Sequence, residues 1–136
     1  VFTLLGDGEL SEGSVWEAAT SASKYNLDNL VVIIDRNKLQ ITGSTEEINP
    51  IEPLSDKFES FGFNVQEAEG NSIESLLNIF QNIPFQEGMP NMIIANTIKG
   101  AGISFIENQV SWHHKVPTQE EFNLAIQELE ENLKNA

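Results

Sequence analysis

VFTLLGDG, residues 1–8, joins a short apolar run to an aspartate that lies between two glycines. The apolar part predicts a buried strand over residues 1–5 that stops at the glycines. Two further runs are continuous and rich in β-branched residues, LVVIID at 30–35 and MIIANTI at 92–98. Continuous apolar strands are typical of a parallel sheet that is covered on both faces.

Helical segments separate these strands along the chain. Apolar residues recur at spacings of three and four, and the expected helices span 14–25, 55–60 and 72–82. Ser11 stands where the first of them would begin. A strand–helix–strand order that repeats along a chain predicts an α/β fold, a parallel sheet with helices on both faces.

The remaining segments are less regular. Thr118 and Glu121 form a capping-box pattern that predicts the start of a last helix. The other expectations are a polar loop at 36–49, a weaker strand at 63–68 and an irregular segment at 100–117.

The composition limits the classes of partner. The chain has 136 residues, with 21 acidic and 7 basic side chains and a formal net charge of −14. Such a chain has no electrostatic footprint for nucleic acid or an anionic membrane, so neither is an expected partner. It contains no cysteine, which excludes thiol catalysis, disulfides and thiolate metal sites. No apolar run approaches the roughly 18 residues of a membrane span, and we expect a single cytoplasmic domain over residues 1–136.

Polar residues at the strand ends predict one shared site. In a parallel sheet, ligands bind outside the carboxyl ends of the strands, where Asp7 and Asn37 fall. Mg²⁺ takes oxygen ligands, usually one or two protein groups with waters and substrate phosphates. Asp7 offers an anionic oxygen and Asn37 a neutral one. Gly6 and Gly8 are expected to allow positive φ and close approach to a diphosphate, and a helix near Ser11 to direct N–H groups at the anion.

Each motif alone also has an ordinary structural explanation. A Gly-Asp-Gly sequence is a common acidic turn, and an asparagine after a strand usually forms a turn. Glu12 and Glu17 would most often be charges on a helix face, and a loop histidine is usually solvated. The combination of motifs is far more specific than any one of them.

Together these motifs resemble the transketolase family of thiamine-diphosphate enzymes. Residues 6–13 (GDGELSEG) and the Glu-Ala pair at 17–18 are similar to the first half of the family's cofactor motif. Residues 35–43 (DRNKLQITG) are similar to its second half, at the family's spacing. Residues 96–102 (NTIKGAG) and 112–114 (WHH) resemble a later glycine motif and the histidine that follows it.

The resemblance implies a site for thiamine diphosphate and Mg²⁺. In the family the cofactor ylid adds to a ketose, cleaves a carbon–carbon bond and carries a two-carbon unit to an aldose. The roles carried over are magnesium ligation by the side chains of Asp7 and Asn37 and the carbonyl of Leu39, and a catalytic and cofactor-binding role for His113. The other expected cofactor-binding residues are Gly6, Asp7, Gly8, Glu12, Asn37 and Ile41. Glu12 and Glu17 also match glutamates near the subunit interface, which in the family help to couple paired sites.

The resemblance also implies a partner. Residues 105–108 (FIEN) are close to a stretch in the amino-terminal subunit of split transketolases. We therefore expect the carboxy-terminal portion of a diphosphate-binding domain, acting on sugar phosphates with a pyrimidine-binding domain or subunit, in a homodimer or heterotetramer. The glutamate that activates the aminopyrimidine belongs to that other domain, so the isolated chain is expected to be inactive. Because a buried strand rarely begins a protein, we expect a longer polypeptide.

The sequence departs from the family at two positions and leaves other functions open. Asn96 replaces the usual lysine, and His114 replaces a glycine. A deoxyxylulose-phosphate synthase or a 2-oxoacid dehydrogenase component is the alternative within the class. A receiver-like signalling domain would use Lys99, but residues 63–69 offer no aspartate for phosphorylation. A non-catalytic remnant would keep the fold without the cofactor.

Overall fold

Four parallel strands form the central sheet of the computed structural model, which describes residues 1–135. The two inner strands, β2 (Val31–Arg36) and β6 (Asn91–Asn96), are largely buried, as their continuous apolar sequences predict. β1 (Phe2–Gly6) pairs with β2 and forms one edge, and β5 (Asn64–Glu69) pairs with β6 and forms the other. All four predicted strands are present.

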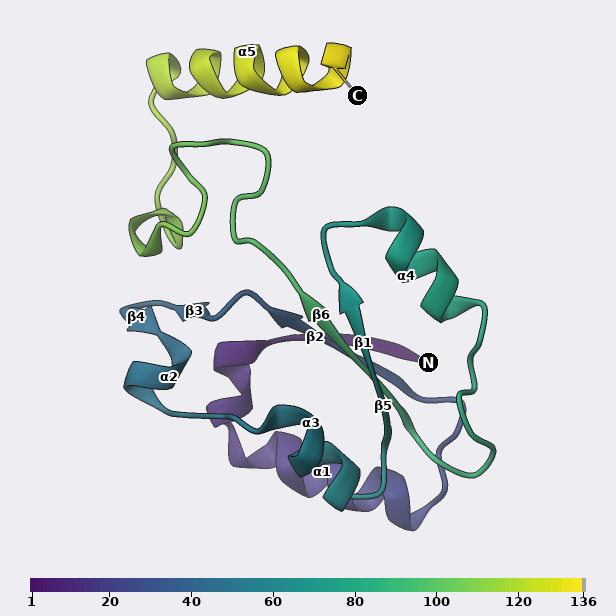
Figure 1. Cartoon of the computed structure of the whole chain (residues 1–136). Helices are drawn as coiled ribbons and strands as arrows, with labels where there is room; N and C mark the ends of the chain where they lie inside the picture. Colours follow the sequence, from purple (N-terminus) through teal and green to yellow (C-terminus); the bar gives the residue numbers. More distant parts are fainter. Residues whose placement is uncertain (136) are drawn as a thin grey trace.

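Helices cover both faces of this sheet (Figure 1). α1 (Gly13–Lys24) and α3 (Leu54–Ser60) lie against one face, and α4 (Ile73–Phe80) lies against the other. Their apolar spacing requires a buried surface, which the sheet supplies. The predicted α/β architecture is confirmed.

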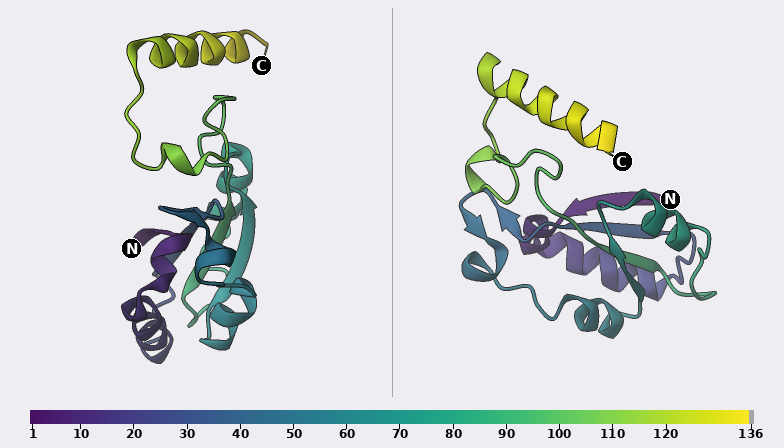
Figure 2. Two further views of the ribbon diagram at one scale, coloured as in Figure 1. Left: turned by 90° about the vertical axis from the view of Figure 1, so that its left-hand side faces the viewer. Right: turned by 45° about the horizontal axis from the view of Figure 1, so that its top comes forward.

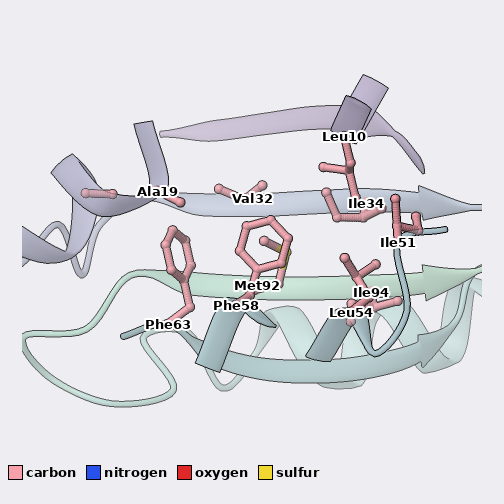
Figure 3. Packing of buried hydrophobic residues seen from close by; sticks show 11 residues of the cluster. Leu10, Ala19, Val32, Ile34, Ile51, Leu54, Phe58, Phe63, Met92 and Ile94 are labelled. Carbon is pink, nitrogen blue, oxygen red and sulfur yellow. The ribbon is translucent and has the colours of Figure 1, made fainter. Parts of the chain in front are cut away.

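The larger hydrophobic core lies between the sheet and the helices α1 and α3 (Figure 3). Phe58 of α3 is 1% exposed and stacks on Trp16 of α1 at a centroid distance of 5.1 Å. It also meets the edge of Phe63 at 5.6 Å. Burying a side chain of this size stabilises the fold by about 1.5–3 kcal/mol. A smaller cluster on the opposite face joins Val31 and Ile93 to α4.

Two local predictions are wrong. Residues 36–49 are not a plain loop, because β3 (Leu39–Gln40) pairs with β4 (Gly43–Ser44) in a short hairpin. The helix α2 (Thr45–Ile48) follows, and the Ser44 hydroxyl caps it by accepting from the Glu47 N–H at 3.3 Å. Ser11 does not begin the first α-helix. It ends the short 3₁₀ helix η1 (Asp7–Ser11), and α1 begins at Gly13.

The carboxy-terminal helix α5 (Gln119–Asn135) lies apart from the sheet, beyond a long connection that contains η2 (Val110–Trp112) (Figure 2). The predicted capping box is confirmed: the Glu121 N–H donates to the Thr118 hydroxyl at 3.2 Å, and the Thr118 N–H donates to the Glu121 carboxylate at 2.8 Å. Within residues 1–135, no helix is long and apolar enough to cross a membrane.

Candidate functional site

A cavity of about 590 Å³ opens where β1 and β2 end. Its walls come from three parts of the chain: the start of η1, the turn and hairpin after β2, and the loop that follows η2. The position agrees with the general rule that parallel sheets bind ligands at the carboxyl ends of their strands. The lining residues are Gly6, Asp7, Gly8, Glu9, Asn37, Leu39, Gln40, Ile41, Thr42 and His113.

Asp7 is the buried anion of this cavity. Its side chain is 1% exposed, and its Oδ2 accepts from Arg36 Nη1 at 2.9 Å and from the Lys38 backbone N–H at 2.6 Å. Both bonds stabilise the carboxylate, since a buried charge needs a partner and hydrogen bonds. The first turn of η1 and the end of β2 therefore meet at this one oxygen.

The turn after β2 wraps around Asp7 in an uncommon backbone conformation. Lys38 has a φ of 66°, in the left-handed region that a non-glycine residue enters at a cost of order 1 kcal/mol. The Asn37 side chain folds back, and its Oδ1 accepts from the Leu39 N–H at 3.0 Å. Strained positions of this kind cluster at ligand sites, and this one lies between two residues that line the cavity, Asn37 and Leu39.

Arg36 is a site residue that the sequence reading did not identify. Its guanidinium is 2% exposed and bonds Asp7, Thr45, Glu46 and Glu52. Burial acts to lower the pKa of Arg36, but the hydrogen bonds to Glu52 and Asp7 outweigh it and raise that pKa. Burial likewise acts to raise the pKa of Glu52, and the bond from Arg36 outweighs it and lowers that pKa. A charged residue that ends a continuous apolar strand is the sequence signal that would have marked it.

His113 reaches the cavity from the far end of the chain. Its Nδ1 is buried and has no hydrogen-bond partner within residues 1–135. The ring meets His114 edge-on at a centroid distance of 4.6 Å. Burial, followed by the positive charges of Lys99 and His114, lowers the pKa of His113. The lowered pKa favours the neutral imidazole, whose Nδ1 has no partner within residues 1–135.

Gly6 and Gly8 do not provide the positive φ that the sequence led us to expect. Gly6 has a φ of −76°, and neither glycine is among the positive-φ residues of the described chain, so that part of the prediction is wrong. A side chain at Gly8 would place its Cβ 3.0 Å from Gln40 Cβ, because η1 packs tightly on the hairpin. At Gly6 a Cβ would meet nothing within 4 Å. Gly8 allows close packing, and Gly6 borders open space.

The structure brings together most of the residues that the sequence singled out. The cavity is lined by Gly6, Asp7, Gly8, Asn37, Leu39, Ile41 and His113, whereas Glu12 and Glu17 do not line it. Nor do the first residues of α1, so the N–H groups near this cavity belong to η1 and the turn. Glu9, Gln40 and Thr42 also line it. They lie inside the two recognised motifs, but nothing in the sequence distinguished them from their neighbours.

The oxygen donors of the cavity suit a cation that binds together with an anionic ligand such as a diphosphate. Within residues 1–135, no group of three or more His, Cys, Asp or Glu side chains could hold a metal ion. Asp7, Asn37 and the Leu39 carbonyl offer one anionic and two neutral oxygens. A small hard cation completes such a shell with waters and phosphate oxygens. His113 also lines the cavity, so its ring is a further polar contact for a ligand.

The whole chain was compared with known families and structures. Residues 1–132 match the family model described as "Transketolase, thiamine diphosphate binding domain". The chain belongs to the transketolase family. A subunit of the apulose-4-phosphate transketolase of Actinobacillus succinogenes is 51% identical over 96% of this chain and 47% of its own length. "6-deoxy-6-sulfo-D-fructose transketolase subunit SqwG" of Clostridium sp. is 43% identical over 96% of this chain and 47% of its own.

Solved transketolases show the same fold. The crystal structure of transketolase from Campylobacter jejuni superposes with a TM-score of 0.87 and 28% identity, covering 95% of this chain and 20% of that one. The chain spans about half the length of the curated transketolase subunits that it matches. The architecture and the family are therefore those of a thiamine diphosphate binding domain.

Proposed function

We propose that this chain is the carboxy-terminal portion of the diphosphate-binding domain of a transketolase. It would transfer a two-carbon ketol unit from a ketose phosphate to an aldose phosphate, with thiamine diphosphate and Mg²⁺ as cofactors. The observation that carries the proposal is the cavity itself. In a member of this family, a buried aspartate, the Asn37 turn with Lys38 at positive φ, and His113, whose Nδ1 has no partner within residues 1–135, surround one space.

The cavity residues divide into two groups. Asp7, Asn37 and the Leu39 carbonyl would hold Mg²⁺, because they are the oxygen donors at the strand ends. His113 would hydrogen-bond the diphosphate or the reacting group, because its ring lines the cavity and the lowered pKa favours the neutral form, in which one ring nitrogen donates and the other accepts. Ile41, 60% exposed, lines the cavity and would cover the thiazolium side of the cofactor.

The remaining cofactor contacts come from the motif at the start of η1. Gly6 and Gly8 would lie at the diphosphate, where Gly6 leaves room for a ligand atom. Glu12 does not line the cavity. Its proposed part is the other one that the family resemblance implies, at the subunit interface with Glu17. When bound, thiamine diphosphate supplies the carbanion chemistry of the reaction.

The proposed enzyme needs a second protein component. Two similar relatives are each named as one subunit of an apulose-4-phosphate transketolase, which supports a split enzyme with a separate pyrimidine-binding subunit. The substrates in the names of the relatives differ, apulose 4-phosphate in one and 6-deoxy-6-sulfo-D-fructose in another. We therefore propose that the donor substrate is a ketose with a phosphate or a similar anionic group.

Calorimetric titration of thiamine diphosphate into the chain, with and without Mg²⁺ and with and without the candidate partner subunit, tests the proposal. Magnesium-dependent binding is expected in at least one of these conditions. Asp7→Asn should abolish this binding. Arg36 and the Lys38 N–H both donate to one side-chain oxygen, so the asparagine would keep its oxygen there and present its NH₂ group, which is not a metal ligand, to the cation. Asp56→Asn, the same change on an exposed position of α3, should bind like the wild type.

Each other outcome points to an alternative function. A folded chain that binds no cofactor even with its partner would be a non-catalytic remnant. Phosphorylation by a small phosphodonor would indicate a receiver-like domain. Cofactor binding together with turnover of a 2-oxoacid, rather than of a ketose phosphate, would assign the chain to a different branch of the thiamine-diphosphate enzymes.

A further inference from the structure

We propose that Arg36 is a positioning residue that makes Asp7 a one-oxygen ligand and thereby favours Mg²⁺ over Ca²⁺. The inference rests on the proposed function, because it needs a cation in this cavity. It concerns a residue that lies outside the cavity wall and acts only through Asp7.

The first argument is the burial of the guanidinium. Arg36 is 2% exposed, and withdrawing such a cation from water is strongly unfavourable unless every donor is satisfied. All five of its N–H groups have an acceptor. Nη1 donates to Asp7 and Thr45, Nη2 to Glu46 and Glu52, and Nε to Glu52, at 2.7–3.2 Å. The guanidinium therefore has one available orientation.

The second argument is the difference between its carboxylate partners. Glu46 and Glu52 are 39% and 51% exposed, so water can replace Arg36 at either one. Asp7 is 1% exposed and has no such alternative. The outer glutamates fix the guanidinium, and the guanidinium fixes Asp7. Without Arg36, Asp7 would be left with the single N–H of Lys38.

The third argument concerns which oxygen of Asp7 is free. Oδ2 already accepts two hydrogen bonds, from Arg36 and Lys38. Oδ1 accepts none from residues 1–135 and is the oxygen left for a ligand. Mg²⁺ requires nearly octahedral geometry and takes one oxygen of a carboxylate, whereas Ca²⁺ tolerates more ligands and bidentate carboxylates. A carboxylate that has only one oxygen available for metal binding suits Mg²⁺, the smaller ion.

Charge alone does not explain this arrangement. A positive group next to a cation site would weaken binding, but the carboxylates of Glu46 and Glu52 offset the charge of Arg36. The effect of Arg36 therefore depends on the planar arrangement of its five N–H donors. Lysine cannot reproduce this arrangement, because its ammonium donates from a single nitrogen. Arg36→Lys therefore keeps the charge and removes the orientation.

The test measures thiamine diphosphate binding supported by Mg²⁺ or by Ca²⁺, in the condition in which the wild-type chain binds. Arg36→Lys should weaken the Mg²⁺-supported affinity about tenfold or more, the range found for residues that orient metal ligands, and the Ca²⁺-supported affinity by less than about threefold. The measured quantity is the ratio of the two affinities. A general loss of stability would lower both affinities together and leave this ratio unchanged.

A second variant covers the case in which Arg36→Lys does not fold. Glu46→Ala removes one bond from Nη2 at an exposed position of α2 and should shift the ratio in the same direction by a smaller factor. Glu47→Ala is its matched control, because the neighbouring glutamate is exposed and makes no side-chain bond to Arg36. Glu47→Ala should leave the ratio unchanged.

The outcomes separate this inference from the proposed function. If the wild-type chain binds no cofactor with either metal, even with its partner, the proposed function fails. If the wild type binds but Arg36→Lys keeps the wild-type ratio, the inference on Arg36 is overturned and the proposed function stands. Equal ratios for Glu46→Ala and Glu47→Ala would overturn it as well.

Discussion

His113 combines an unpaired buried nitrogen with a lowered pKa. The largest cause is burial, which disfavours the imidazolium, and the charges of Lys99 and His114 add to it. Between the ordinary pKa near 6.5 and the lower folded value, the unfolded chain binds more protons than the folded chain. The contribution of His113 to stability is therefore present above pH 6.5 and is lost as the pH falls through this window.

We predict that Lys99→Met raises the pKa of His113 without bringing it above its ordinary value, because burial persists in the variant. The measurement is an NMR titration of the His113 ring proton, assigned with His113→Gln. Lys134→Met, a charge change near the end of α5, is the matched control. A pKa that is equal in the wild type and the Lys99 variant would show that Lys99 does not act on this ring.

The two motif glycines should respond differently to the same added methyl group. We predict that Gly8→Ala lowers the free energy of unfolding by about 1–3 kcal/mol, because its Cβ would lie 3.0 Å from Gln40 Cβ. Gly6→Ala should cost little stability, since nothing lies within 4 Å of the added group, but should weaken cofactor binding. Denaturant unfolding and calorimetry measure the two effects, and equal stability losses would contradict the packing argument.

At the scale of helices and strands, the best-defined boundary is the start of α5. Thr118 and Glu121 cap it reciprocally, and the hydrogen bond from Lys115 to Glu121, with the Thr118 N–H, lowers the pKa of Glu121. A lowered carboxyl pKa means that the cap contributes above the ordinary value and weakens as the pH falls through the folded value.

We predict that Thr118→Ala destabilises α5 by about 1 kcal/mol, because the side chain no longer accepts from the Glu121 N–H. Thr118→Ser keeps the acceptor and should behave like the wild type. Amide hydrogen exchange over residues 119–125 reports this local change, whereas a global melt need not detect it. Unchanged exchange in the alanine variant would mean that tertiary contacts, such as Ser104 with Glu128, hold the helix instead.

The sequence predicted some strands and helix starts correctly and missed others, and the difference has physical causes. β2 and β6 are continuous apolar runs, so their burial on both faces could be read directly. The hairpin of β3 and β4 was not predicted, since strands of two residues carry no periodicity. Ser11 is a good N-cap type, but the chain forms η1 first and α1 begins two residues later. Residue type alone does not distinguish these starts.

At the scale of the whole molecule, two elements, β1 and α5, expose large apolar side chains to solvent. Phe2 and Leu4 of the edge strand β1 are 65% and 68% exposed. α5 also leaves apolar side chains uncovered, and five of them are two-fifths exposed or more: Phe122, Leu124, Ile126, Leu129 and Leu133. An exposed edge strand with apolar side chains favours association with another chain.

We predict that the isolated chain self-associates and that the association increases with salt, because salt screens the repulsion of a net charge of −14. Leu4→Lys should reduce it by placing a charge on the β1 edge. Val116→Lys, which changes a still more exposed apolar residue in a loop, is the control. Sedimentation velocity over a concentration series measures the effect, and a monodisperse monomer at high salt would contradict the prediction.

The sequence alone determined the order of the main strands and helices, the α/β class and the family, because these depend on local apolar patterns and on motifs of contiguous residues. It also marked Asp7, Asn37 and His113 as candidates. Only the tertiary structure brought them to one cavity and showed Arg36 holding the Asp7 carboxylate. The reason is that the surroundings of a buried charge come from segments distant in sequence, here the end of β2, α2 and the loop before α3, and no local pattern specifies their meeting.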